Sequence, residues 1–187
     1  MQAVADNYEN IPDELKKLPR WVVATLVLDE DDAQTIKAKK CPINARTGKK
    51  ASTTNPDTWS TFAEATAAIE TERVTSYGLR GECGVAGYLG FVLGDGYAGI
   101  DLDHVISPNP ETGEGVIAPW AYKVVCDLNS YAEYSPSGTG IHVICRGVMV
   151  PENGRTRATV ATNEDGTPQG SEMYDHGRYF RMTGDVL

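Results

Sequence analysis

The amino-acid sequence predicts an α+β fold in which a few helices flank a mostly antiparallel sheet. Several segments are rich in β-branched residues or alternate apolar and polar residues, as strands do. Short turn sequences join several of these segments as hairpins. Segments with apolar residues at helical spacing fall between them at irregular intervals. Strand and helix do not alternate strictly, and this pattern favours an antiparallel sheet.

The N-terminal part is expected to begin with a loose segment over residues 1–10. A proline at its start and lysines towards its end predict a short helix over 12–18. The β-branched run 21–28 predicts a strand. Residues 29–40 change from acids to lysines and are expected to form an exposed loop.

A hairpin and a longer helix should follow. Residues 41–44 and 49–52 flank a tetrapeptide typical of a turn between two strands. Asn55 and Pro56 predict a helix start, because Asn is a favoured N-cap and Pro a favoured first residue. Apolar residues at helical spacing extend this helix to about Glu70.

Two strands, 84–93 and 98–105, are expected in the middle of the chain, joined as a hairpin by a Gly-Asp-Gly turn. A loop over 108–115 should then lead to a helix over 117–128. That helix is expected to direct a stripe of apolar side chains inwards, namely Trp120, Ala121, Val124, Val125 and Leu128.

The C-terminal part is expected to contain four short strands. Residues 131–134 and 141–148 form the first pair, and the polar segment 151–170 should be mobile. Residues 171–174 and 178–183 should form a final hairpin around a turn that contains Gly177. If this turn has a bulge, Tyr179 lies opposite Glu172, and otherwise Phe180 does.

Length and composition suit one globular domain with a core, since the chain has 187 residues of which 41% are hydrophobic. No apolar run approaches the roughly 18 residues that span a bilayer. The N-terminal segment is acidic, unlike a signal or transit peptide, so a cytoplasmic protein without a membrane partner is expected. The four cysteines lack zinc-site spacing, which favours buried free thiols.

The net charge of −9 argues against a general nucleic-acid-binding surface, which is normally basic. An enzyme that holds metal ions with carboxylates stays compatible with this charge. Two basic clusters could still contact a nucleic-acid backbone, unless they are merely solvated surface. The first cluster contains Lys37, Lys39, Lys40, Arg46, Lys49 and Lys50, with Lys39, Lys40, Lys49 and Lys50 as the candidate DNA contacts, and the second contains Arg155, Arg157, Arg178 and Arg181.

The first motif that could carry chemistry is Asp101-Leu102-Asp103. Residues two apart on a strand share a face, so both carboxylates lie together while Leu102 faces the core. Two close carboxylates repel each other unless a cation lies between them, and Mg²⁺ and Mn²⁺ prefer oxygen ligands. The alternative is a pair of exposed acids at a strand end.

The second motif is the small-residue loop over 135–140 followed by His142. Its glycines, Gly138 among them, let backbone N–H groups converge on an anion, and the hydroxyls of Ser137 and Thr139 add donors. His142 could contact the same phosphate. The alternative is a tight turn with a core histidine.

The third motif is Glu172, followed by Arg178 and Tyr179. Glu172 could complete a three-carboxylate metal site. Arg178 could pair with a phosphate or the template, and Tyr179 could stack on a base or sugar and so set sugar discrimination. The alternatives are a cross-strand Glu–Arg pair and a core aromatic ring.

In this order the three motifs resemble those of the archaeo-eukaryotic primase superfamily, in particular the primase-polymerase domains of phages and plasmids. The resemblance extends from about Leu18 to Gly184 and includes 19–22, 41–44 and Asn55-Pro56. It implies an RRM-like antiparallel sheet with an N-terminal α/β unit. The segment 80–90 is longer than the approach to the first motif that this family leads one to expect.

The resemblance also implies a template-directed nucleotidyltransferase that uses Mg²⁺ or Mn²⁺. Asp101, Asp103 and Glu172 would hold the metals, and Ser137 and His142 would contact the triphosphate. The expected partners are nucleoside triphosphates, a single-stranded DNA template and a primer. Residues 1–187 would form one catalytic domain, the N-terminal part of a longer phage or mobile-element replication protein with a C-terminal helicase domain or partner, working in a bacterial or phage-infected cell.

Other functions stay open. A replication initiator that nicks DNA through a tyrosine normally needs a His-x-His pair, and the sequence after His142 lacks the second histidine. A metal-dependent nuclease is harder to separate from a polymerase on acids alone. A non-catalytic RRM-like module needs exposed aromatic residues on its sheet, whereas the expected face carries acids and a histidine. No GxxxxGK[ST] sequence is present.

Overall fold

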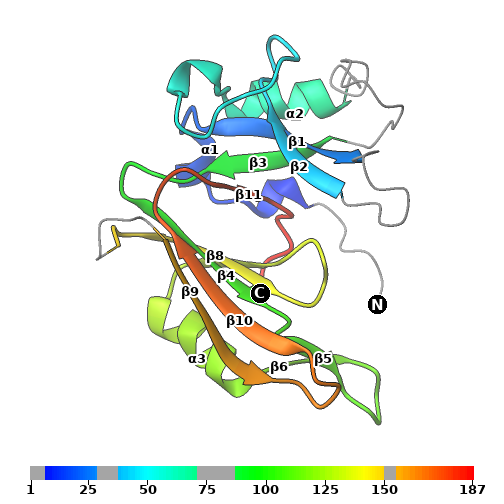
Figure 1. Cartoon of the computed structure of the whole chain (residues 1–187). Coiled ribbons are helices and arrows are strands. Elements are labelled where there is room, and N and C mark those ends of the chain that lie inside the picture. Colours follow the sequence, from blue (N-terminus) through cyan, green and yellow to red (C-terminus); the bar gives the residue numbers. More distant parts are fainter. Residues whose placement is uncertain (1–6, 29–37, 71–86, 150–154) are drawn as a thin grey trace. The chain divides into compact units, whose positions relative to one another are not determined.

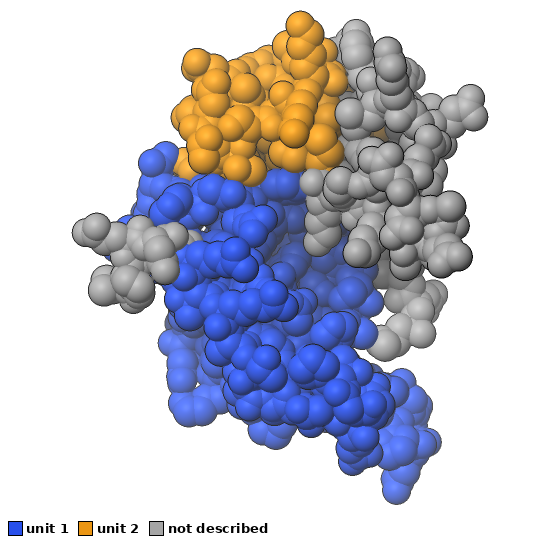
Figure 2. Space-filling view, viewed as in Figure 1, with its two compact units in different colours: residues 1–12, 93–187 blue, residues 13–92 orange. Residues whose placement is uncertain are grey.

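The computed structural model of this chain describes residues 7–28, 38–70, 87–149 and 155–187 (Figure 1). The chain forms two compact units, drawn in different colours in Figure 2. One unit comprises residues 1–12 and 93–187, and the other comprises residues 13–92. No helix among the described residues is long and apolar enough to span a membrane.

The unit that carries the three motifs is built on a five-stranded antiparallel sheet of order β7-β8-β4-β10-β9. Its strands are β4 (Tyr97–Asp103), β7 (Tyr131–Tyr134), β8 (Ile141–Arg146), β9 (Arg155–Thr162) and β10 (Pro168–Tyr174). Further elements of this unit are η1 (Tyr8–Asn10), β5 (Ile106–Pro108), β6 (Gly115–Ile117), α3 (Pro119–Leu128) and β11 (Tyr179–Arg181). Together with the second unit, these elements confirm the predicted α+β, mostly antiparallel fold.

Alternation along the strands separates an apolar face from a polar one. Ile100 and Leu102 of β4 are buried together with Ile141 and Val143 of β8, and Ala121 of α3 packs into the same core. The other residues of the predicted helix stripe lie partly buried against this core, and Figure 1 shows α3 along this side of the sheet. The opposite face is left for the polar residues of the motifs.

The second unit contains three antiparallel strands in the order β3-β1-β2, namely β1 (Trp21–Leu28), β2 (Ala38–Ile43) and β3 (Tyr88–Val92). Its helices are α1 (Asp13–Lys16), η2 (Pro56–Thr58) and α2 (Phe62–Glu70), which packs on β1 and β3. The fully buried Trp21 forms edge-to-face contacts with Phe62 and Phe91, with ring centroids 5.0 and 5.2 Å apart. Its indole N–H donates to the carbonyl of Leu15.

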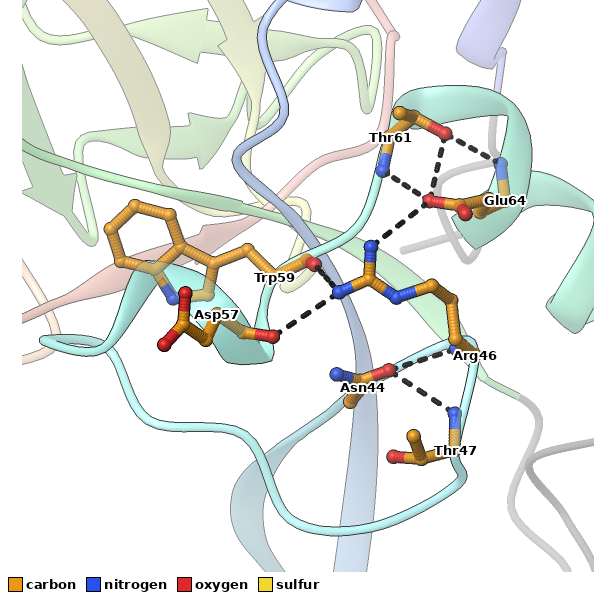
Figure 3. A network of polar contacts seen from close by, with 7 residues as sticks. All are labelled: Asn44, Arg46, Thr47, Asp57, Trp59, Thr61 and Glu64. Carbon is orange, nitrogen blue, oxygen red and sulfur yellow. Dashed lines mark hydrogen bonds and ion pairs between the residues drawn. The ribbon is translucent and has the colours of Figure 1, made fainter.

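A polar network fixes the turn after β2 in this second unit (Figure 3). The Asn44 side chain accepts the backbone N–H groups of Arg46 and Thr47 at 2.9 and 3.1 Å. The Arg46 guanidinium donates to the backbone carbonyls of Trp59 and Asp57 at 2.8 and 3.2 Å. Arg46 therefore ties the turn to the segment before α2.

The predicted helix over 55–70 is in fact two helices. Asn55 caps η2 as expected, because its side chain accepts the N–H of Asp57. The chain then extends, since Ser60 pairs with Trp21 through two backbone hydrogen bonds of 2.7 and 3.0 Å. A second start follows, where Thr61 and Glu64 bond each other's backbone N–H as a capping box. The sequence analysis missed this box.

Two expectations for the neighbouring segments also need correction. Residues 38–40 belong to β2 rather than to a loop, because β2 pairs with β1; residues 29–37 lie outside the described part. The hairpin expected over 41–52 is reduced to the single bridge between Ile43 and Lys50. The strand predicted over 21–28 is confirmed.

The hairpin predicted around Gly94–Gly96 is a turn without a ladder. Asp95 and Gly96 both have positive φ, and Gly94 and Tyr97 exchange two backbone hydrogen bonds. Beyond this bridge the strands part, because β4 pairs with β8 and β10 while β3 pairs with β1. The part of the predicted strand before residue 87 lies outside the described residues.

The predicted C-terminal hairpin is wrong, because β10 pairs with β4 and β9. Glu172 therefore lies opposite Asp101 and Arg157, and neither Tyr179 nor Phe180 pairs with it. Within the polar segment 151–170, which was expected to be mobile, residues 155–162 form β9 and residues 168–170 begin β10, while residues 151–154 lie outside the described part. The side chains of β9 are mostly exposed and give no strand pattern, but its backbone pairs with β10. The loop expected over 108–115 is bounded by the paired strands β5 and β6.

Two smaller expectations concern the N-terminus and the cysteines. Residues 7–10 are not loose, because the Asn7 N–H donates to the Thr183 carbonyl at 2.6 Å and the Asn10 side chain donates to the Gly184 carbonyl at 3.2 Å. The described cysteines are free, as expected, but Cys41 and Cys145 are only half-buried and Cys126 is exposed. Burial raises the pKa of both half-buried thiols.

Candidate active site

Ionisable side chains form one row across all five strands of the sheet. From β7 to β9 the paired residues are Glu133, His142, Asp101, Glu172 and Arg157. Directly paired residues project from the same face of a sheet, and this face is opposite the one that α3 covers. The structure thus brings one residue of each motif into a single line, which is called the charged row below.

The first motif lies at the centre of the charged row. Asp101 and Asp103 are both half-buried, whereas Leu102 between them is fully buried, so the predicted facing of this motif is confirmed. The Asp101 Oδ1 atom is 3.7 Å from His142 Nε2. Asp103 lies one step along the same face, opposite Gly170 of β10, so no side chain stands across from it on that strand.

Glu172 continues the charged row and already has two partners. Its Oε1 atom is 2.8 Å from Nε of Arg157, and its Oε2 atom accepts the hydroxyl of Tyr174. Burial, this hydrogen bond and the charge of Glu172 raise the pKa of Tyr174, so its hydroxyl stays a donor at neutral pH. The Arg178 guanidinium lies over the Tyr174 ring, 5.1 Å from its centroid.

The three carboxylates supply the oxygen donors that Mg²⁺ and Mn²⁺ prefer. Nevertheless, among the described residues no three His, Cys, Asp or Glu side chains are arranged to hold a metal ion. Glu172 faces Arg157 and Tyr174 in this arrangement. The donor set fits such an ion, provided that Glu172 turns from one of these partners towards Asp101.

His142 is buried in the charged row between two carboxylates. Its Nδ1 atom is 3.6 Å from Glu133 Oε1 and makes no hydrogen bond. The Phe180 ring stacks on the imidazole at a centroid distance of 4.6 Å. Phe180 can lie there because the neighbouring residue on β4 is Gly99, where a Cβ atom would come within 2.6 Å of the ring.

The small-residue loop of the second motif packs beside the end of β4 that carries Asp103. The Thr139 carbonyl accepts the N–H of Ile106 at 2.9 Å, and a Cβ atom on Gly140 would lie 2.6 Å from the Leu102 carbonyl. The hydroxyl oxygen of Ser137 lies 2.9 Å from those of both Ser135 and Thr139. The backbone N–H groups of Gly138 and Thr139 also donate within the loop, to the Ser135 carbonyl and the Ser137 hydroxyl.

The remaining predicted residues are placed differently. Tyr179 is half-buried on β11, and its role as a sugar-discriminating residue stays a prediction, although the hairpin used to place it does not exist. Lys49 and Lys50 are exposed and follow the turn that Asn44 fixes, while Lys39 and Lys40 lie on β2. His104 and His176 are exposed, as expected.

Sequence reasoning missed Glu133 and the contact of Phe180 with His142. The alternation of side chains along β7 could have revealed Glu133. Tyr131 and Glu133 share one side of the strand, while Ala132 and Tyr134 contribute to the core on the other side. The position of Phe180 could not be read from local spacing, because β11 lies outside the five-stranded sheet.

No family model matches the sequence. Over 150 residues, or 79% of this chain, it is 37% identical to a protein named DNA Primase-polymerase from Nitratiruptor phage NrS-1. The matched part makes up 18% of that protein's length. The chain is therefore related in sequence to a phage-type primase-polymerase, the class of protein that its three motifs resemble.

Proposed function

We propose that this chain is a template-directed nucleotidyltransferase, a DNA primase-polymerase of phage or mobile-element replication. It would join a nucleoside triphosphate to the 3′-hydroxyl of a primer on a single-stranded DNA template and release pyrophosphate. The observation that carries the proposal is the charged row, where Asp101, Glu172 and His142 of three separate motifs lie side by side. The similarity to a phage DNA primase-polymerase supports it.

Asp101, Asp103 and Glu172 would hold Mg²⁺ or Mn²⁺, which supplies positive charge for the attacking and leaving oxygens. Glu172 would turn from Arg157 to join the two aspartates. Arg157 is mostly exposed on an edge strand, so breaking this ion pair should cost only about 0–1 kcal/mol. Once released, its guanidinium could pair with a phosphate group.

The loop before His142 would hold the triphosphate. The hydroxyls of Ser137 and Thr139 would donate to phosphate oxygens, and His142 on β8 would contact the same triphosphate. Because this chemistry needs little covalent participation by the protein, these residues would act by positioning and by charge stabilisation.

Primer extension tests this proposal. The wild-type chain is incubated with a primed single-stranded template, with either deoxyribonucleoside or ribonucleoside triphosphates, and with Mg²⁺ or Mn²⁺. We expect the primer to lengthen with release of pyrophosphate, and Glu172→Gln to abolish both. Degradation of the template without pyrophosphate would indicate a nuclease, and template binding with neither reaction would indicate a passive binding module.

The DNA contacts should lie in the basic clusters, so affinity should fall steeply with salt despite the net charge of −9. Each phosphate contact contributes a slope of about −0.7 to a log–log plot of affinity against salt for single strands. The double substitution Lys49→Gln and Lys50→Gln should flatten this slope, with Lys123→Gln on α3 as the control. An unchanged slope would remove these lysines from the interface.

A further inference from the structure

Glu133 is a buried carboxylate that no motif contains. Its side chain is fully enclosed, and its oxygens accept the N–H groups of Thr183 and Gly184 at 3.1 and 2.9 Å. The Tyr131 hydroxyl donates at 2.5 Å, and burial together with the charge of Glu133 raises the pKa of Tyr131, so this donor is retained. A charge is rarely buried without such partners.

The fourth neighbour of this carboxylate is His142. The imidazole is held in place by the stacked ring of Phe180, with Nδ1 directed to Glu133 and Nε2 directed to Asp101. A carboxylate can only accept a hydrogen bond, so a bare Nδ1 lone pair facing Glu133 would be repelled. The nitrogen that carries the proton in a histidine is set by the group that the other nitrogen meets.

From this geometry we infer that Glu133 is a positioning residue that acts through His142. It keeps a proton on Nδ1 and holds the ring so that Nε2 is the atom directed towards the site. This inference rests on the proposed function for the identity of the ligand. The pairing of Glu133 with His142 can be tested without it.

A purely structural role for Glu133 is the competing explanation. Glu133 binds the backbone of Thr183 and Gly184, so its loss would loosen the C-terminal segment whatever happens at His142. A stability measurement alone cannot separate the two roles. The protonation pattern of the His142 ring can separate them, because a residue that only anchored the backbone would not determine which ring nitrogen carries a proton.

The first measurement uses the wild-type chain without nucleotide or metal. The ¹⁵N resonances of the histidine rings are recorded at neutral pH and assigned with His104→Gln and His176→Gln, which replace the other two histidines. We expect His142 to carry a proton on Nδ1, and a bare Nδ1 overturns the inference. This result is independent of polymerase activity, so it also stands if the chain extends no primer.

The second measurement is a double-mutant cycle on nucleotide affinity. A non-hydrolysable deoxynucleoside triphosphate is titrated in Mn²⁺ into wild type, Glu133→Gln, His142→Gln and the double variant, with exposed Glu111→Gln as control. We expect Glu133→Gln to weaken binding about tenfold alone and not at all after His142→Gln, which is the non-additivity of coupled residues. Equal losses in both backgrounds overturn the inference, and the ring resonances decide it if Glu133→Gln does not fold.

Discussion

Each end of the charged row pairs a carboxylate with a nitrogen-containing side chain, but one pair is buried and the other is exposed to solvent. At the β7–β8 end, the side chains of Glu133 and His142 are 0% and 5% exposed. At the β10–β9 end, the values for Glu172 and Arg157 are 15% and 69%. Removing one partner from a buried pair leaves an uncompensated charge, whereas water takes over the partner's role in an exposed pair.

This difference suggests a division of work along one row of residues. The buried end is tied to the backbone at Thr183 and Gly184, so its geometry is fixed when the chain folds. The exposed end lies on an edge strand and can rearrange. A site that admits a metal ion and a triphosphate, as proposed for this row, would need both a fixed part and a part that can rearrange.

The largest expected effect lies between the two ends. Asp101→Ala or Asp103→Ala should lower the rate of nucleotide incorporation by at least about 10²–10³-fold, because charge stabilisation at a reacting centre is lost. The melting temperature should stay equal or rise slightly, since one of two neighbouring like charges is removed. Near wild-type incorporation by either variant would place the reaction elsewhere.

At the buried end, the effect should fall on stability. Glu133→Ala should lower the free energy of unfolding by about 3–5 kcal/mol, because three donors lose their acceptor and the His142 ring loses the carboxylate beside it. Urea unfolding followed by circular dichroism measures this loss. Glu111→Ala, at an exposed position, is the control, and an equal change in both variants would show that the buried end is not special.

A smaller loss of stability should follow from a larger side chain at Gly99, which packs against the Phe180 ring next to His142. Gly99→Ala would bring its methyl group within 2.6 Å of Phe180 and 2.7 Å of Leu93, and such overpacking typically costs about 1–3 kcal/mol. Phe180 would have to move off His142, so triphosphate affinity should fall as well. Gly96→Ala is unsuitable as a control because of its positive φ, but Gly147→Ala adds a methyl group where no atom lies within 4 Å. Equal stability of the Gly99 and Gly147 variants would show that the Phe180 ring is not closely packed.

The smallest expected effect is at the exposed end. Arg157→Gln should change the free energy of unfolding by less than about 1 kcal/mol. Because Glu172 loses a competing cation, Mn²⁺ affinity measured calorimetrically on the nucleotide-free chain should rise by up to about fivefold, the factor that corresponds to about 1 kcal/mol. A fall in Mn²⁺ affinity would mean that Arg157 holds Glu172 in the metal-binding orientation instead.

Local periodicity was sufficient for the features that depend on nearest neighbours in the chain. The alternation of Asp101 and Asp103 with Leu102 follows from the 2.0-residue repeat of a strand, and the inward stripe of α3 from the 3.6-residue repeat of a helix. The strand over 21–28 follows from its β-branched residues. The α+β class followed from the same patterns. These features hold whatever the strands pair with, because side-chain direction is fixed by the local backbone conformation.

Strand partners were decided only by the tertiary structure. Of the predicted hairpins, 131–134 with 141–148 forms its ladder, and that over 41–52 keeps one bridge. The strands flanking Gly94–Gly96 and those flanking Gly177 do not form hairpin ladders, since β4 pairs with β8 and β10, and β10 pairs with β4 and β9. The exposed strand β9 has no apolar pattern, and its backbone hydrogen bonds with β10 define it. The sequence thus determined which residues within a motif share a face of their strand. Long-range pairing decided that Glu172 meets Asp101 and Arg157, and that Glu133 meets His142, because a strand's own sequence does not specify which edge it joins.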